Sequence, residues 1–329
     1  MAAPQGICVL AEVTEENNPT SLTLELLGLA KRLASASGGK TTAVLLGSGV
    51  SAAAQELAGR GADEVFLAED AGLAAYDPEI YAGVLAKLWE PQPPSVILSG
   101  HTAMGQDLLP RLAFSLEAGL VTDCVGVEAD ASGITFTKPI YGGNGLATQK
   151  TTTPVAMATV RARVGDALPQ GETAGEVKAV EVDIPAQSRL EHKGKELLSD
   201  RECPLEEAPV VISGGRGMGG GEGFELLREL ASLLGGGVGA SRPPVDSGWA
   251  PTTCQVGITG KVVAPDIYIA VAISGSTQHL SGMGESGKIV AINKDPEAYI
   301  FKVSDYGAVG DWKQVLPAFT AALRELVSE

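Results

Sequence analysis

The stretch that decides the fold of the C-terminal third is Val210-Val211-Ile212-Ser213-Gly214-Gly215-Arg216-Gly217-Met218-Gly219-Gly220, which leads into Phe224–Leu234. Its apolar start, Val210–Ser213, predicts a buried strand, and the glycines that follow predict a loop at Gly219–Gly223. The apolar spacing of Phe224–Leu234 predicts a helix. A strand that runs through glycines into a helix is the beginning of a βα unit.

The rest of this third continues the alternation of strand and helix. Ile267–Ile273 and Lys288–Ile292 predict two further strands, and Trp312–Leu326 predicts the closing helix. We therefore expect residues 206–329 to form a second α/β domain.

The N-terminal region shows the same repetition. Strands are expected at Ile7–Leu10, Thr42–Leu46, Glu64–Leu67 and Ser95–Ser99, and helices at Ser21–Ser35, Ser51–Ala58, Asp77–Trp89 and Gly105–Leu116. Buried parallel strands are near-continuous apolar runs of this kind. The pattern predicts an N-terminal α/β domain whose parallel sheet is covered by helices.

The pattern changes after residue 120. Val121–Val127, Ile134–Ile140 and Val155–Val160 predict strands joined by Gly and Asn turns, which indicates an antiparallel extension of the N-terminal domain. Residues 165–208 are rich in Pro, Glu, Gly and Lys and have weak periodicity, so they are linker-like. We expect one domain at 1–205, with this tail, and a second at 206–329.

Gly215, Gly217 and Gly220 match the dinucleotide pattern G-x-G-x-x-G between a strand and a helix. Such glycines let the backbone approach a pyrophosphate, and the helix N-terminus attracts its charge. The full fingerprint also needs an acid about 20 residues further on, at the end of the second strand. Asp246 is the nearest acidic residue, but it does not lie at the end of a predicted second strand. The sequence also shows no cluster of residues that could act as a general acid or base. An NAD-linked dehydrogenase is therefore an alternative without further support.

A second strand–loop–helix runs from Tyr268 through Ser274–His279. Small residues at the carboxyl end of a strand leave backbone N–H groups for an anion. Ser274 and Ser276 can equally well be helix caps, so these residues alone leave both interpretations open.

Composition narrows the function. The formal net charge of −16 argues against a nucleic-acid ligand; the acidity keeps the protein in solution or steers basic partners. The cysteines Cys8, Cys124, Cys203 and Cys254 form no C-x-x-C pair, so we expect reduced thiols and no metal centre. The sequence shows no membrane span and no signal or transit peptide, which predicts a cytoplasmic protein.

An ordered series of blocks carries a resemblance. The blocks are Ser213–Gly217, Val238–Trp249, Gln255–Lys261, Ile273–Met283 and Val290–Ala298. Together they closely resemble the FAD domain of electron-transfer flavoprotein α subunits. Leu108–Ala113 and Tyr141–Gly145 resemble the same family more loosely, so the resemblance spans nearly the whole chain.

The resemblance implies that the C-terminal domain is doubly wound and that it holds one FAD in an extended pose. The residues that it places at the cofactor are Arg216, Ser241, Arg242, Val256, Gly257, Ile258, Thr259, Ser274, Gly275, Ser276, Thr277, Gln278, His279, Asn293, Asp311 and Trp312. It implies Arg242 over the isoalloxazine, the Thr259 hydroxyl at N5 and His279 near the C2 carbonyl. Asn293, Asp311 and Trp312 are implied at the adenosine end.

These roles fit the chemistry of a flavin. A reduced flavin carries negative charge around N1 and the C2 carbonyl, so a cation or a strong donor there raises the potential. Arg242 is always charged, and His279 can donate a hydrogen bond or become protonated. Taken without the surrounding blocks, Arg242 could instead form a surface ion pair with Asp246, and His279 could cap a helix.

Two positions depart from the family pattern. Ile258 stands where the family commonly has Gln; the backbone N–H remains, so we expect FAD to bind with an altered potential. Trp312 is bulkier than the pattern suggests, so we expect it to contact the cofactor through its backbone.

By resemblance the chain is an electron carrier without an organic substrate of its own. The implied partners are a β subunit, which forms a heterodimer and holds AMP or a second FAD, flavin dehydrogenases of the acyl-CoA dehydrogenase type active in fatty acid β-oxidation, and a quinone-linked oxidoreductase. Two alternatives stay open: a bifurcating flavoprotein that oxidises NADH, and an interaction subunit that has lost its cofactor. No catalytic or metal-ligating residues are expected.

Overall fold

The computed structural model describes residues 6–90, 92–130, 133–143, 145–171, 174–184, 188–194, 205–206 and 208–327. The chain divides into two compact units. Unit 1 comprises Met1–Ile140 and Leu146–Glu196, and unit 2 comprises Tyr141–Gly145 and Leu197–Glu329. The main change of unit, between residues 196 and 197, lies somewhat before the boundary expected from the sequence.

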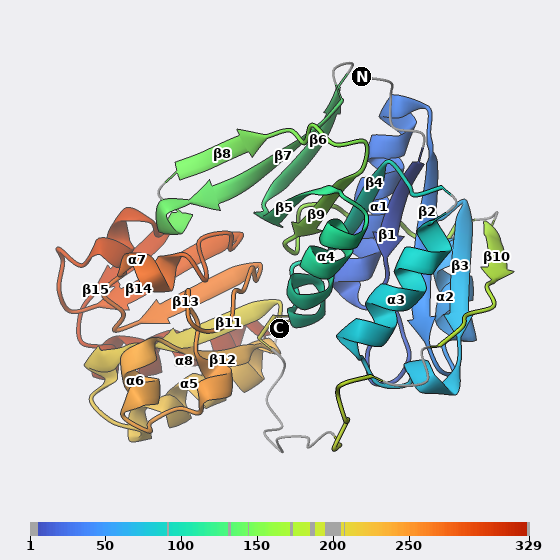
Figure 1. Cartoon of the computed structure of the whole chain (residues 1–329). Coiled ribbons are helices and arrows are strands. Elements are labelled where there is room, and N and C mark those ends of the chain that lie inside the picture. The colour runs from blue at the N-terminus through green and yellow to red at the C-terminus, as the bar shows by residue number, and fades with distance from the viewer. Residues whose placement is uncertain are drawn as a thin grey trace. The chain divides into compact units, whose positions relative to one another are not determined.

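Unit 1 contains a seven-stranded sheet in the order β10-β3-β2-β1-β4-β9-β5 (Figure 1). Each pair of neighbours in this sheet is parallel. Its strands are β1 (Gly6–Leu10), β2 (Lys40–Gly47), β3 (Glu64–Glu69), β4 (Val96–Gly100), β5 (Gly119–Cys124), β9 (Ala156–Val160) and β10 (Glu176–Ala179).

Helices cover both faces of this sheet. They are α1 (Ser21–Ser37), α2 (Ser51–Gly59), α3 (Pro78–Trp89) and α4 (Ala103–Ser115). Because successive strand residues point to opposite faces, Val9 packs in one core cluster with α1 and α2, and Leu10 packs in the other with α3 and α4. Side chains cap three of the helix starts, namely those of Thr20, Asp77 and Thr102.

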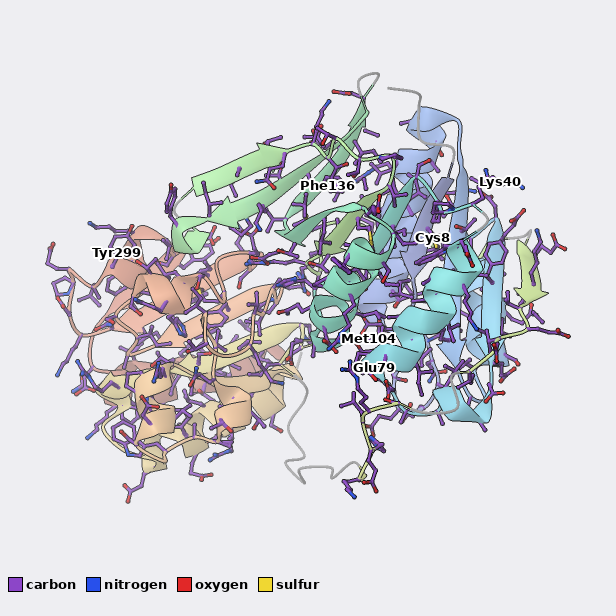
Figure 2. All side chains as sticks on the ribbon, in the orientation of Figure 1. Cys8, Lys40, Glu79, Met104, Phe136 and Tyr299 are labelled. Carbon is purple, nitrogen blue, oxygen red and sulfur yellow. The ribbon has the colours of Figure 1, made fainter. Side chains whose placement is uncertain are left out.

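The antiparallel part is smaller than the sequence suggested. It is the three-stranded sheet β6 (Gly126–Asp130), β7 (Gly133–Ile140) and β8 (Gly145–Gln149). The predicted strand Val121–Val127 is in fact split between β5 and β6, and Val155–Val160 corresponds to β9, which lies within the parallel sheet. Short apolar runs do not reveal their pairing partner, which explains the error. Phe136 of β7, labelled in Figure 2, is fully buried in the unit 1 core.

The linker-like tail also contains regular structure. Glu176–Ala179 forms strand β10, which pairs in parallel with β3 at the edge of the sheet. Its side chains are at most half-buried, so the segment lacks the apolar signal of the inner strands. The assignment of 165–208 as linker throughout was therefore wrong at this strand.

Unit 2 is a five-stranded parallel sheet in the order β12-β11-β13-β14-β15. Its strands are β11 (Val210–Gly214), β12 (Gly237–Ala240), β13 (Ile267–Val271), β14 (Lys288–Asn293) and β15 (Tyr306–Val309), and its helices are α5 (Glu222–Leu234), α6 (Arg242–Asp246), α7 (Thr277–Leu280) and α8 (Trp312–Val327). Two apolar clusters, one on each face, form its core. The expected fold class, two α/β domains with an antiparallel extension on the first, is confirmed.

Short 3₁₀ turns complete the described elements. They lie at Ala71–Leu73, Tyr141–Gly143, Arg216–Met218, Thr252–Cys254 and Tyr299–Lys302.

Candidate cofactor site

The strand order of unit 2 determines where a ligand can bind. From β11 the chain moves to β12 on one side, then crosses to β13 and continues to β14 and β15 on the other side. In an open parallel sheet, the carboxyl ends of the strands at such a reversal leave a crevice for a ligand. The residues expected at FAD lie at these carboxyl ends, or in the segment 256–259, which follows a bridge between Ala240 at the end of β12 and Gln255.

The glycine loop after β11 lies against the loop after β13. The N–H of Gly215 donates to the Val271 carbonyl at 2.9 Å, and a Cβ at Gly215 would lie 2.1 Å from the Ala272 oxygen. A Cβ at Gly217 would lie 3.0 Å from that of Ala272. These glycines therefore allow the two loops to pack closely against each other. In a dinucleotide fingerprint, by contrast, the glycines let the backbone approach a pyrophosphate. Arg216 is exposed, and its side chain has no partner within the described residues.

Ser241 and Arg242 follow β12. Ser241 is 9% exposed, its N–H donates to the Gly214 carbonyl at 3.0 Å, and its hydroxyl has no partner in the described part of the chain. Arg242 forms the ion pair that its spacing allowed: its Nε lies 3.2 Å from Oδ2 of Asp246. The Arg242 side chain is 65% exposed, so this pair is weak and the guanidinium remains accessible to a ligand.

The backbone of the segment 256–259 is largely engaged within the protein. Val256 donates to the Ala240 carbonyl at 2.9 Å, and Gly257 donates to that of Lys261 at 3.1 Å. The Ile258 N–H donates to the Gln278 carbonyl at 2.8 Å. The expectation that this N–H is available to FAD was wrong, because the sequence does not show that the segment packs on α7.

Thr259 is the exception in this segment. Its N–H has no acceptor within the described residues. Its Oγ1 accepts a hydrogen bond from Nε2 of Gln255 at 2.9 Å, so the hydroxyl proton is not used in that bond. The Thr259 side chain is exposed, as is that of Ile258. Thr259 can therefore offer two donors to a ligand.

The loop after β13 presents a run of backbone donors. Ala272 and Gly275 have φ of 55° and 84°, and a Cβ at Gly275 would lie 2.3 Å from the Ile300 nitrogen. The N–H groups of Ser274–Gln278 have no acceptor among the described residues. Ser276 stands at the N-cap of α7 without a side-chain hydrogen bond, so it does not act as a side-chain cap. These donors can bind an anionic group.

His279 lies in the interior of unit 2, with 4% exposure. Nδ1 lies 3.1 Å from the Val256 carbonyl oxygen, and Nε2 lies 2.9 Å from the Tyr268 hydroxyl. A carbonyl only accepts, so Nδ1 carries the proton and Nε2 accepts from Tyr268. Burial lowers the pKa of His279 to about 4, so the ring is neutral at neutral pH. A bond from this ring to the flavin C2 carbonyl would require one of these two bonds to be exchanged.

The adenosine-end residues are tied to the neighbouring loops. Nδ2 of Asn293 donates to the Ile273 carbonyl at 2.8 Å, and its Oδ1 accepts from the Asp295 N–H at 3.0 Å. Asp311 precedes α8 and accepts from the Lys313 N–H at 3.0 Å. The indole of Trp312 donates to the Gly217 carbonyl at 3.1 Å. The large Trp312 side chain therefore holds α8 to the glycine loop.

Comparison with known proteins identifies the family. The Electron transfer flavoprotein domain model matches residues 7–185, and the Electron transfer flavoprotein FAD-binding domain model matches residues 204–284. The chain is 42% identical to "Electron transfer flavoprotein subunit alpha" of Thermoanaerobacterium thermosaccharolyticum over 93% of this chain and 94% of that protein. The chain belongs to the electron transfer flavoprotein alpha subunit family. It is also 39% identical to the protein of that name in Bacillus subtilis (97% of this chain, 98% of that one) and 42% identical to "Protein FixB" of Clostridium saccharobutylicum (98% of each).

The residues of this electron transfer flavoprotein alpha chain fit FAD. The unpaired donors of the loop 274–278 suit a pyrophosphate, and Arg216 and Arg242 supply positive charge at the same carboxyl edge. The Ser241 hydroxyl and both donors of Thr259 suit polar atoms of the cofactor. In the described part of the chain, no three His, Cys, Asp or Glu residues are grouped as metal ligands. No helix among the described residues is long and apolar enough to cross a membrane.

The cysteines of the described residues are buried thiols, at Cys8, Cys124 and Cys254. Burial raises the pKa of the Cys8 and Cys124 thiols to about 12. Cys203 lies outside the described residues.

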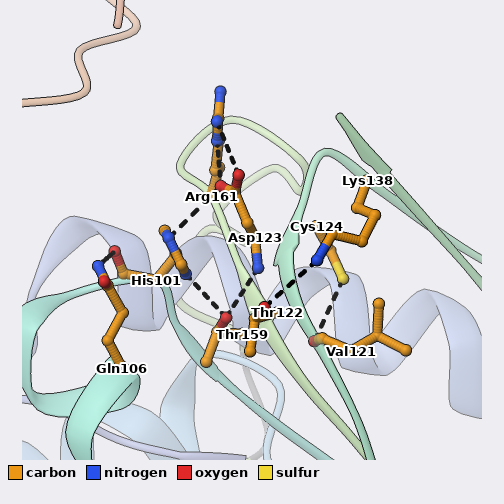
Figure 3. Close-up of polar contacts among 9 residues, drawn as sticks. All are labelled: His101, Gln106, Val121, Thr122, Asp123, Cys124, Lys138, Thr159 and Arg161. Carbon is orange, nitrogen blue, oxygen red and sulfur yellow. Dashed lines mark hydrogen bonds and ion pairs between the residues drawn. The ribbon is translucent and has the colours of Figure 1, made fainter. Parts of the chain in front are cut away.

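A second polar cluster lies in unit 1 of this alpha chain (Figure 3). Arg161 Nε and Nη2 lie 2.6 and 3.0 Å from the two carboxylate oxygens of Asp123, and His101 Nε2 lies 3.4 Å from Oδ1. Thr159 Oγ1 lies 2.8 Å from Nδ1 of His101 and accepts from the Asp123 N–H at 3.0 Å. Burial lowers the pKa of His101, against the opposing effect of the Asp123 carboxylate.

Sequence analysis missed this cluster because its members are far apart and match no motif. They share one signal: each lies at or just after the carboxyl end of a strand, β4 for His101, β5 for Asp123 and β9 for Thr159 and Arg161. The contacts among these residues join the ends of the three strands.

Proposed function

We propose that this chain holds one FAD at the carboxyl edge of the unit 2 sheet and carries electrons between other proteins as the alpha subunit of a heterodimer. Membership of the family supports electron transfer and FAD binding in general terms. The observation that carries the residue assignments is the set of donors accessible at one edge of the sheet. The N–H groups of Ser274–Gln278 and Thr259 have no acceptor within the described residues, and the side chains of the two arginines are exposed.

Each group has a role that its chemistry suits. The loop 274–278 binds the pyrophosphate, and Arg216 with Ser241 contacts the cofactor. Arg242 lies over the isoalloxazine, where a fixed positive charge favours the reduced flavin. Thr259 donates to N5. Asn293, Asp311 and Trp312 form the adenosine end; Asn293 and Trp312 also brace the loops around it. The bound flavin supplies the reversible one-electron chemistry.

The proposed redox partners come from the resemblance to the family. We infer that flavin dehydrogenases of the acyl-CoA dehydrogenase type supply the electrons and that a quinone-linked oxidoreductase accepts them. A beta subunit completes the heterodimer and holds AMP. The net charge of −16 favours brief, electrostatically guided docking to partners with basic surfaces. Residence in the cytoplasm stays a prediction.

The experiment that tests this function is to produce the alpha–beta pair, count its nucleotides and mix it with electron donors without oxygen. We expect one FAD and one AMP per heterodimer, reduction by a substrate-reduced acyl-CoA dehydrogenase, and no reduction by NADH. Two FAD with prompt bleaching by NADH would replace the simple carrier with a bifurcating flavoprotein. A colourless pair that binds no FAD would mean that the cofactor has been lost.

A further inference from the structure

We propose that Gln255 is a positioning residue that fixes the Thr259 hydroxyl as a hydrogen-bond donor to flavin N5, so that the first electron enters without a proton. This inference rests on the proposed function, since it requires FAD at the assigned site. It goes beyond that function by giving Gln255 a role in controlling the protonation of N5.

The turn that carries both residues is closed by its own backbone. The Gln255 N–H donates to the Thr252 carbonyl at 3.1 Å, and the Gln255 carbonyl accepts from the Lys261 N–H at 2.7 Å. A Cβ at Gly260 would lie 2.3 Å from that same carbonyl oxygen, so the turn has no room for a side chain there. The backbone on both sides of Thr259 is therefore held.

The side-chain amide of Gln255 determines how the Thr259 hydroxyl can form hydrogen bonds. Nε2 donates to Thr259 Oγ1 at 2.9 Å. A threonine hydroxyl has one proton and two lone pairs, so an amide N–H on one lone pair leaves the proton to be donated elsewhere. No described residue accepts that proton, so the exposed Thr259 side chain can donate it to a ligand or to water.

The direction of this bond matters for the flavin. N5 has a lone pair before reduction and can gain a proton with the first electron. A hydroxyl held as a donor stabilises the lone pair and opposes a proton on N5. If the Gln255 amide is removed, the hydroxyl can rotate and accept from an N5 proton. One electron from the reductant is then accompanied by one proton from water.

The charged groups around this turn are already paired or neutral. Lys261 pairs with Glu206 at 2.7 Å, and Arg242 pairs with Asp246 at 3.2 Å. His279 donates to the Val256 carbonyl and is neutral at neutral pH, because burial lowers its pKa to about 4. Ile258 brings no second amide to compete for the Thr259 hydroxyl.

The test is a spectroelectrochemical titration of the FAD-loaded alpha–beta pair between pH 6.5 and 8.5. For the unaltered protein we expect a first one-electron potential that does not change with pH. For Gln255→Met we expect the potential to decrease as pH rises, with a slope that approaches about 59 mV per pH unit, the value for one proton per electron. Gln255→Lys keeps a donor and has no acceptor, so its potential should again be independent of pH.

Two further variants separate the possible outcomes. Gln55→Met, at an exposed position of α2, should leave the potential unchanged at every pH. Thr259→Val should acquire pH dependence by itself, and adding Gln255→Met to it should change nothing further. Equal pH slopes in Gln255→Met and the unaltered protein, or a steep slope in the unaltered protein, would overturn the inference. Failure of the unaltered pair to bind FAD would instead overturn the proposed function.

Discussion

At the scale of single residues, the surface ion pair of Arg242 is compatible with the cofactor role proposed for this side chain. Its Nε contacts Asp246 at 3.2 Å, while most of the side chain is exposed at the carboxyl edge where FAD is assigned. The guanidinium cannot lose its charge, so at the proposed site it would stabilise negative charge on a reduced flavin at any pH. Asp246 competes for the same cation.

We therefore predict that Arg242→Ala lowers the flavin potential. An exposed cation is worth about 1–2 kcal/mol to the anion, which corresponds to roughly 40–90 mV for one electron. Asp246→Asn removes the competing carboxylate and should shift the potential upward. Arg228→Ala, which removes the same charge from helix α5, is the control. A redox titration measures all three, and unchanged potentials in both site variants would argue against contact between Arg242 and the flavin.

At the scale of elements, the polar cluster of unit 1 ties the ends of β4, β5 and β9 together. Asp123 has φ of 64°. Its carboxylate accepts from Arg161 and lies 3.4 Å from Nε2 of His101, so it contacts residues that follow two other strands. The Arg161 and Asp123 side chains are only 13% and 26% exposed, which makes loss of the charge costly.

Asp123→Asn tests this element-level role. Asparagine tolerates a positive φ, so the substitution removes the charge and preserves the backbone. We expect the free energy of unfolding to fall by about 1–3 kcal/mol in urea unfolding experiments. Asp183→Asn breaks the ion pair between Lys87 and the Asp183 carboxylate, which is 86% exposed, and should leave the free energy of unfolding nearly unchanged. Similar small effects of both substitutions would show that the cluster does not hold the strand ends.

At the scale of the whole molecule, the buried His279 and the partly buried His101 make stability depend on pH. The pKa of His279 is about 4 in the folded chain, against 6.5 for an exposed histidine. Between these values the unfolded chain binds more protons, so the free energy of unfolding decreases as pH falls from 6.5 toward 4. The shift corresponds to about 3 kcal/mol at most. The lowered pKa of His101 acts in the same direction.

We predict that His279→Gln weakens this acid sensitivity. The Gln amide can donate to the Val256 carbonyl and accept from Tyr268 without titrating. His192→Gln, at an exposed position, serves as the matched control and should leave the pH profile unchanged. The measurement is urea unfolding at pH 4.5, 5.5, 6.5 and 7.5. Identical profiles for His279→Gln and the unaltered chain would contradict the assignment of the buried neutral ring.

The sequence by itself determined the alternation of strand and helix, and through its ordered blocks it determined the family. Apolar runs such as Val210–Ser213 are long enough to specify buried strands, because burial of the run dominates local preference. Most of the residues that the blocks assign to FAD lie at or after strand ends in unit 2, whereas Val256–Thr259 follow the bridge at Gln255. The sequence also revealed the possible Arg242–Asp246 pair, since its i,i+4 spacing is local.

The tertiary structure alone decided the features that depend on non-local contacts. Strand pairing placed β9 and β10 in the parallel sheet, because pairing is set by packing over long separations. The Ile258 N–H is used by Gln278, and His279 is enclosed by Tyr268 and Val256, through contacts that no local pattern encodes. The cluster around Asp123 and the donors left free at Thr259 emerged in the same way. Which polar groups are already paired is a property of the folded chain, and it determines which ones remain for a cofactor.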